Sequence, residues 1–179
     1  QKSFVSVFFS LLTAINFYEK TIDINSNYVG AYNSLGVLLN QLGEYRKSMI
    51  CFEKAIHIQP NNANTYNNLG NINKEIGKHQ KAISFYERAI QINPNLIIAY
   101  NNLGSTFKEL GEHEKAINCF EKAIQIQPDN LTSHWLSMNI FPVIYKDINE
   151  IELYRKRFKN CIRKINRLLE RQSAYTKKQ

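Results

Sequence analysis

Apolar and polar positions recur along this chain with a period of 34 residues, in two amphipathic segments per period. Within residues 61–94, the first segment carries Tyr66, Leu69 and Ile76 at helical spacing. The second segment carries a wider apolar face, formed by Ala82, Ile83, Phe85, Tyr86, Ala89 and Ile90. The pattern predicts one pair of short helices in each period. Such short helices are marginal alone, so we expect each pair to be stabilised by stacking on its neighbours.

Glycine and proline mark where the predicted helices end. Gly77 follows the first segment and can adopt the left-handed conformation that ends a helix. Pro94 follows the second segment and cannot continue a helix. The glycines in this register are Gly43, Gly77 and Gly111, and the prolines are Pro60, Pro94 and Pro128.

Small residues inside the segments indicate close contact between the paired helices. Gly70 lies in the middle of a predicted helix, where glycine costs roughly 0.5–1 kcal/mol relative to alanine. Close approach of the second helix would offset that cost. The small residues that we assign to these contacts are Gly36, Gly70, Gly104, Ala82 and Ala116.

The period and its motifs resemble the tetratricopeptide repeat (TPR) family. The block Tyr-Asn-Asn-Leu-Gly occupies 66–70 and 100–104, and 32–36 differs from it only at Ser34. The resemblance implies an all-α solenoid of antiparallel helix pairs in a right-handed superhelix, with C-terminal capping helices. It assigns full repeats to 27–60, 61–94 and 95–128. Solenoids of this kind present long concave surfaces to other chains, which predicts a protein–protein interaction module.

Residues 1–26 are predicted to form a partial, degenerate repeat. Ala14–Asn25 matches Ala82–Asn93 position for position, and Phe9 stands where a repeat would have its glycine. The apolar run that opens this segment predicts a buried helix. A secretory signal or membrane anchor is the alternative, but the run lacks a small-residue cleavage motif and is shorter than the roughly 20 residues that span a bilayer. An exposed partial repeat also predicts self-stacking between chains.

The positive charge gathers at the C-terminal end. Residues 1–145 hold 12 basic and 11 acidic side chains, whereas residues 146–179 hold 11 basic and 4 acidic ones. We expect an atypical capping helix over 129–145 and a basic amphipathic helix and tail over 146–179. The apolar stripe of the latter is Ile151, Tyr154, Phe158, Cys161, Ile165 and Leu168.

The basic helix has more than one possible role. Its stripe favours docking on the last repeat, with flanking basic residues Arg155, Lys156, Arg157, Arg163, Lys164 and Arg167. Its charge also predicts binding of an acidic partner. The absence of an aromatic stacking platform in the sequence argues against nucleic acid.

Nothing in the sequence predicts catalytic, metal-binding or cofactor-binding residues. The four histidines are scattered without ligand spacing, and neither a Gly-rich phosphate loop nor an interpretable catalytic constellation is present. The three cysteines are odd in number, and Cys51 and Cys119 occupy a packing position of the repeat. This usage indicates a reducing compartment such as the cytoplasm. We therefore expect no enzymatic activity from this chain.

An asparagine ladder is the predicted partner-binding groove. The TPR resemblance places the first helix of each pair along the concave face, and side-chain amides offer both donors and an acceptor to an extended peptide. The predicted groove residues are Asn33, Asn67, Asn68, Asn71, Lys74, Asn101, Asn102, Ser105 and Lys108. The alternative is background enrichment, because the chain contains 22 asparagines.

The region after Pro128 resembles a second, more specific pattern. Residues 134–145 and 150–158 are similar to the junction between repeats and catalytic region in proteins of the SPINDLY / O-linked GlcNAc transferase type. That resemblance implies a second possible function, the substrate-recognition arm of a protein O-glycosyltransferase. The parent protein would then be a glycosyltransferase whose catalytic region is absent from this chain.

Overall fold

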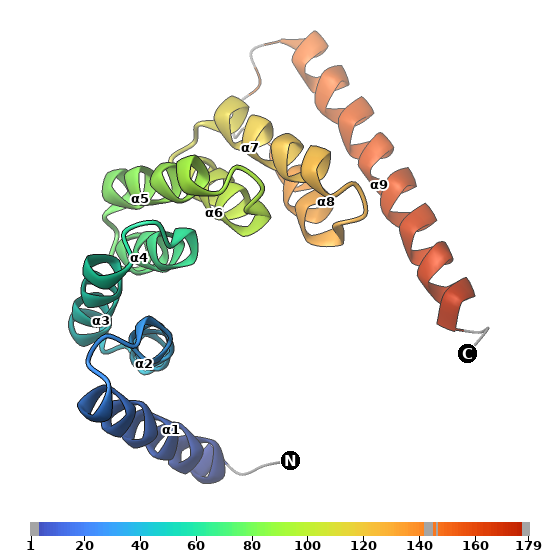
Figure 1. Ribbon diagram of the computed structural model, residues 1–179. Coiled ribbons are helices and arrows are strands. Elements are labelled where there is room, and N and C mark those ends of the chain that lie inside the picture. The colour runs from blue at the N-terminus through green and yellow to red at the C-terminus, as the bar shows by residue number, and fades with distance from the viewer. Residues whose placement is uncertain (1–3, 142–144, 146, 177–179) are drawn as a thin grey trace. The chain divides into compact units, whose positions relative to one another are not determined.

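The computed structural model describes residues 4–141, 145 and 147–176, and every regular element within them is an α-helix (Figure 1). The chain divides into two compact units, Gln1–Pro94 and Asn95–Gln179. Unit 1 contains α1 (Phe4–Ile24), α2 (Val29–Gln41), α3 (Tyr45–Ile58), α4 (Ala63–Glu75) and α5 (His79–Ile92). Unit 2 contains α6 (Ile97–Glu109), α7 (His113–Ile126), α8 (Leu131–Met138) and α9 (Ile148–Thr176). The predicted all-α fold built from helix pairs is confirmed.

The helices end where the sequence predicted. In α2, α4 and α6, the glycine that follows the C-cap residue has a positive φ, namely 77° at Gly43, 76° at Gly77 and 75° at Gly111. Only glycine adopts this conformation without strain, so it reverses the chain between the two helices of a pair. The second helices α3, α5 and α7 each end two residues before a proline.

The two helices of each pair lie in close contact through their glycines. A Cβ atom built on Gly70 would lie 2.5 Å from Cε1 of Tyr86, which is closer than carbon atoms approach. The equivalent rings are Phe52 against Gly36 and Phe120 against Gly104. The alanines at the same crossings, Ala82 and Ala116, are fully buried. These small residues thus lie where the paired helices approach closely.

The first helix of unit 1 differs from a repeat. α1 runs without interruption through Phe9, because no glycine is present there to turn the chain. Its Ile15, Tyr18 and Ile22 pack against a cluster in α2 and α3 that includes Leu35. The opposite side is uncovered, since the exposed large apolar side chains of α1 include Phe9, Leu12 and Phe17. The prediction of a buried helix is therefore wrong for these three side chains.

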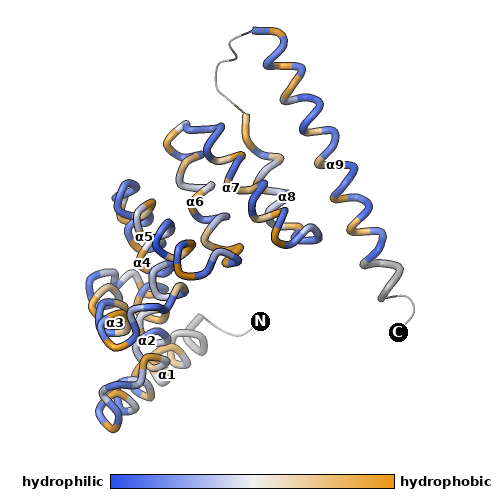
Figure 2. Tube along the Cα trace, turned by 45° about the horizontal axis from the view of Figure 1, so that its top comes forward, coloured by the Kyte–Doolittle hydropathy of each residue, from blue (hydrophilic) through white to orange (hydrophobic). Residues whose placement is uncertain are grey.

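Unit 2 ends in a long amphipathic helix. α9 packs on α8, and its Tyr154 joins a cluster with Ala116, Phe120 and Ile140. Figure 2 shows apolar and polar residues alternating along α9 at helical spacing. Residues 1–3, 142–144, 146 and 177–179 of the predicted terminal segments lie outside the described residues. Among the described helices, none combines the length and apolar character needed to cross a membrane.

Candidate functional site

The first helices of the repeats form a continuous surface in each unit. In unit 1, α2 contacts α4, and in unit 2, α6 contacts α8 (Figure 1). We call the solvent-facing side of these helices the first-helix face, and it is described separately for each unit. The predicted groove residues all lie on α2, α4 or α6.

One row of asparagines lies between successive first helices. In unit 1, the Thr65 hydroxyl donates a hydrogen bond of 2.8 Å to Oδ1 of Asn33. In unit 2, Nδ2 of Asn101 donates a hydrogen bond of 3.0 Å to Oγ of Ser133. Asn67, the repeat equivalent of these two, is 3% exposed. Asn33 and Asn101 therefore each contact a neighbouring first helix of their own unit.

A second row on α4 lies closer to solvent. Asn68, Asn71 and Lys74 are half-buried and lie at helical spacing along one side of the helix. The hydroxyl of Tyr86 donates a hydrogen bond of 2.8 Å to Oδ1 of Asn71. This bond orients the Asn71 amide.

In unit 2, the equivalent repeat positions on α6 are occupied by Asn102, Ser105 and Lys108. The first two are half-buried and Lys108 is exposed. In the same unit, Trp135 of α8 has a large aromatic ring, and 58% of the surface of this residue is exposed. Trp135 stands one repeat after Asn101 in the sequence, and it is the only tryptophan in the chain.

Unit 1 also contains a cavity at the edge of the first-helix face. It has a volume of about 360 Å³ and lies between α1 and α2. Its lining is mixed, with apolar side chains beside amide and hydroxyl groups: Ala14, Tyr18, Asn33, Ser34, Val37 and Leu38. Val37 is 39% exposed. The cavity is large enough for an apolar side chain, and Asn33 and Ser34 supply polar groups beside it.

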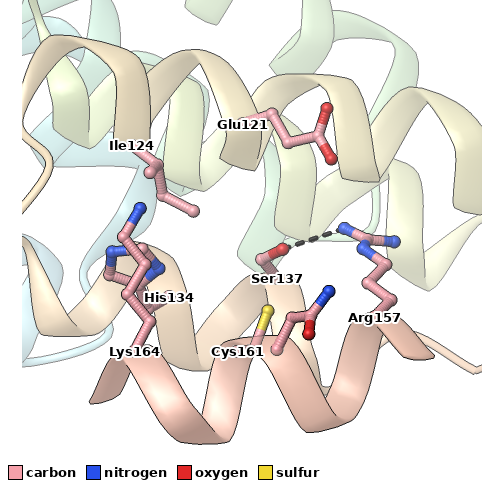
Figure 3. A pocket seen from close by; sticks show the side chains of 8 residues that line it. Glu121, Ile124, His134, Ser137, Arg157, Cys161 and Lys164 are labelled. Atoms are coloured by element: carbon pink, nitrogen blue, oxygen red, sulfur yellow. Dashed lines mark hydrogen bonds between the residues drawn. The ribbon is translucent and has the colours of Figure 1, made fainter. Parts of the chain in front are cut away.

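A second cavity lies in unit 2, where α7, α8 and α9 meet (Figure 3). Its volume is about 250 Å³. Arg157 of α9 lies at its wall and donates a hydrogen bond of 2.8 Å from Nη2 to Oγ of Ser137. Burial lowers the pKa of the Arg157 guanidinium, an effect that the carboxylate of Glu121 opposes. We call this cavity the α7–α9 pocket.

The sequence analysis placed Arg157 beside the apolar stripe together with the other flanking basic residues and did not single it out. Arg157 is half-buried, whereas its neighbours Arg155 and Lys156 are exposed. The spacing of Arg157 along the helix could have revealed that its side chain is half-buried. Arg157 lies three residues after Tyr154 and four before Cys161, so it belongs to the apolar stripe. A second residue that went unassigned is Trp135, which replaces an asparagine of the ladder.

The cysteines are free thiols in different surroundings. Cys51 is buried, while Cys119 and Cys161 are half-buried. Burial raises the pKa of the Cys51 thiol, and the nearby carboxylate of Glu19 raises it further. Within the described residues, no group of three or more histidine, cysteine, aspartate or glutamate side chains is placed to hold a metal ion.

Comparison with known proteins identifies the repeats. A tetratricopeptide repeat model matches residues 29–95 and, in a second overlapping match, 63–129, which together exceed half of the chain. None of the curated proteins compared with the chain matches it.

Similar solved structures are repeat proteins as well. A crystal structure of MamA is 25% identical, with a TM-score of 0.72 over 94% of this chain and 88% of that one. MamA from Desulfovibrio magneticus RS-1 is 18% identical, with a TM-score of 0.68 over 92% and 87% of the two chains. YrrB, described as a TPR protein with an unusual peptide-binding site, is 19% identical, with a TM-score of 0.64 over 98% and 87%. These likenesses confirm the solenoid fold.

Proposed function

The chain belongs to the tetratricopeptide repeat family, and from this premise we propose that its first-helix face binds an extended segment of a partner polypeptide. The observation that carries the proposal is a row of half-buried polar side chains found in each unit, namely Asn68, Asn71 and Lys74 on α4 and, separately, Asn102 and Ser105 on α6. Lys108 extends this row as an exposed side chain. YrrB, which shares the fold, is described as having a peptide-binding site.

The two rows of predicted ladder residues have different roles in this proposal. The outer row meets the peptide backbone, because its amides can donate to peptide carbonyls and accept from peptide N–H groups. Asn33 and Asn101 act indirectly, since their hydrogen bonds join α2 to α4 and α6 to α8, and Asn67 is buried. The α1–α2 cavity receives one apolar side chain of the peptide.

A displayed library of random peptides provides the ligand for the test. The tightest peptide would be titrated against the full chain by fluorescence anisotropy. We expect an Asn68→Ala, Asn102→Ala variant to bind about tenfold more weakly, from the loss of hydrogen bonds contributing about 0.5–1.5 kcal/mol each. The matched control is Asn118→Ala, which removes an exposed amide from the second helix α7.

Two outcomes would contradict the proposal. One is equal affinity of the double variant and the Asn118→Ala control while circular dichroism shows that both remain folded. The other is failure of the library to yield any peptide that binds at micromolar concentration.

The partial repeat supports a second mode of association, self-stacking. The supporting observation is the uncovered side of α1, where Phe9 and Phe17 are 64% and 65% exposed. We propose that a second copy of the chain covers this side. Sedimentation velocity should show concentration-dependent association that a Phe9→Ser, Phe17→Ser variant loses. A wild-type chain that stays monomeric at high concentration would exclude self-stacking.

The transferase alternative gains no support. It rests on residues 134–158, and the tetratricopeptide repeat match ends at residue 129. The similar structures named above are repeat proteins, and none of them is described as a transferase. Peptide binding by the chain itself is therefore the function that we propose.

The cysteine chemistry supports a location in a reducing compartment such as the cytoplasm. Cys51, Cys119 and Cys161 are free thiols, and oxidising compartments favour disulfides. We propose this location for the chain. Secretion of the chain in cultured cells with oxidation of its thiols would contradict it.

A further inference from the structure

The α7–α9 pocket contains a cationic group whose hydrogen bonds are incomplete. Nη2 of Arg157 is satisfied by Ser137, but the buried Nη1 has no hydrogen-bond partner among the described residues. A buried donor left unsatisfied is unfavourable, more so when it carries charge. A planar guanidinium presents its donors as a fork, which matches the two oxygens of a carboxylate.

The other walls of the pocket define what can enter. Lys164 of α9 adds a second positive charge, and Asn160 adds an amide donor and acceptor. Figure 3 shows Lys164 and Arg157 at opposite ends of the drawn site, with Cys161 between them on α9. Ile124 supplies an apolar wall. A carboxylate on a short apolar stem fits this combination of donors, charge and apolar surface.

Glu121 disfavours ligands of higher charge. Its carboxylate also lines the pocket, so it would repel a phosphate monoester, with about −1.5 to −2 charges, more strongly than a singly charged carboxylate. The volume of about 250 Å³ holds a group of side-chain size. The one ring that lines the pocket, the imidazole of His134, is 2% exposed and hydrogen-bonded to the backbone carbonyl of Pro128, so it offers no open platform for stacking nucleic-acid bases.

We propose that the α7–α9 pocket is a second binding site that takes a carboxylate of an acidic polypeptide, with Arg157 as its anchor. The carboxylate is attracted by the positive charges of Arg157 and Lys164 and can accept a hydrogen bond from the amide of Asn160, while Ser137 keeps the guanidinium in place. This site lies on α7, α8 and α9 and does not depend on the first-helix face. The carboxylate can come from an aspartate or glutamate side chain or from a peptide C-terminus.

Three labelled probes distinguish the sources of negative charge. The first is a decapeptide of alternating Glu and Gly with an amidated C-terminus. The second is a Ser/Gly decapeptide with a free C-terminus, and the third is a single-stranded oligonucleotide of the same charge as the first. Binding of either peptide more tightly than the oligonucleotide supports a carboxylate site, and the tighter peptide identifies the source. Equal or tighter binding of the oligonucleotide would overturn the proposal.

The full-length variants Arg157→Gln and Arg155→Gln form a matched pair, because they make the same change in charge on the same helix. Arg155 is exposed and does not line the pocket. We expect Arg157→Gln to weaken peptide binding about tenfold or more, and Arg155→Gln by less than about threefold. Lys164→Gln, at an exposed position, should weaken binding about threefold to tenfold with no effect on folding. Equal losses for all three variants would indicate general attraction to a basic helix and overturn the proposal.

Protection of Cys161 provides a measurement that needs no pocket variant. Its thiol lines the pocket, so bound peptide should slow its alkylation by iodoacetamide in the wild-type chain. Cys119 is the internal control, since it is half-buried but does not line the pocket. Mass spectrometry would report both rates from one sample. Saturating peptide that leaves the Cys161 rate unchanged would overturn the proposal, whatever the affinities of the variants.

Discussion

At the scale of single residues, one aromatic ring sets how closely the two helices of a repeat approach. In the middle repeat, Gly70 lies against Tyr86, which is fully buried. The hydroxyl of Tyr86 is held by Asn71, so the ring cannot move aside without losing a hydrogen bond. The contact explains why a glycine is present in the middle of a helix.

Substitution of Gly70 by alanine should destabilise the chain. The higher helix propensity of alanine would stabilise the folded chain by about 0.5–1 kcal/mol. Overpacking against the Tyr86 ring would destabilise it by about 1–3 kcal/mol. We expect a net loss of about 1 kcal/mol in the free energy of unfolding, measured by urea denaturation. Glu87→Ala, at an exposed position of α5, is the control and should stay within about 0.5 kcal/mol of wild type. Equal stability of the two variants would contradict this contact.

The hydrogen bond between Tyr86 and Asn71 is specific to the middle repeat. The third repeat has Phe120 and Ser105 at the equivalent positions. A double-mutant cycle of Tyr86→Phe and Asn71→Ser should therefore give a coupling energy of about 0.5–1.5 kcal/mol in urea denaturation. The double variant reproduces the natural pair of the third repeat. Additive effects would show that the bond contributes no stability.

At the scale of elements, α8 depends on its first residues because it is only 8 residues long. Asn130 precedes it and accepts a hydrogen bond of 2.9 Å from the backbone N–H of Ser133. Such a cap stabilises a helix by about 0.5–2 kcal/mol. Asn62 caps α4 in the same way, through the backbone N–H of Thr65.

Removal of the cap should loosen α8 before other helices. We expect Asn130→Ala to lower the free energy of unfolding by about 1 kcal/mol and to speed amide hydrogen exchange in α8. Asn118→Ala, at an exposed site in α7, should leave exchange in α8 unchanged. Unaltered exchange in α8 of the Asn130→Ala variant would show that packing alone holds this helix.

The repeat helices could be predicted closely, and the terminal ones less so. The 34-residue register locates glycines such as Gly77 and prolines such as Pro94, and their backbone restrictions end the helices wherever they occur. The uncovered side of α1 was missed, because apolar character does not reveal whether a neighbouring helix is present. The orientation of Arg157 was missed because charge was weighed before spacing.

The sequence could predict which positions lie on the binding face, but not how deeply each side chain is buried. The TPR register places Asn67 and Asn68 side by side in the sequence, yet one is buried and the other half-buried. The difference depends on how each side chain packs in the folded protein, which the repeat register alone does not give. The α7–α9 pocket depends on three helices and could not be derived from any one of them.

At the scale of the whole molecule, a substitution that destabilises one compact unit should leave the stability of the other unit near that of the wild type. Tyr154 of α9 is 8% exposed and belongs to the core of unit 2, together with Phe120 and Ile140. Repeat arrays transmit stability mainly between neighbours. We expect Tyr154→Ala to cost unit 2 about 3–5 kcal/mol. Hydrogen exchange should quicken in α6 to α9 and remain near wild type in α2 and α3. A uniform increase over both units would show that they unfold as one.

The central claim is that the first-helix face binds a polypeptide, and amide chemical-shift mapping by nuclear magnetic resonance tests it most directly. The library-selected peptide would be titrated into the isotopically labelled full chain. The account predicts that the largest shifts fall in the first helices α2, α4 and α6, near residues such as Asn68 and Asn102, with the indole N–H of Trp135 also affected. Largest shifts in the second helices α3, α5 and α7 would contradict the claim.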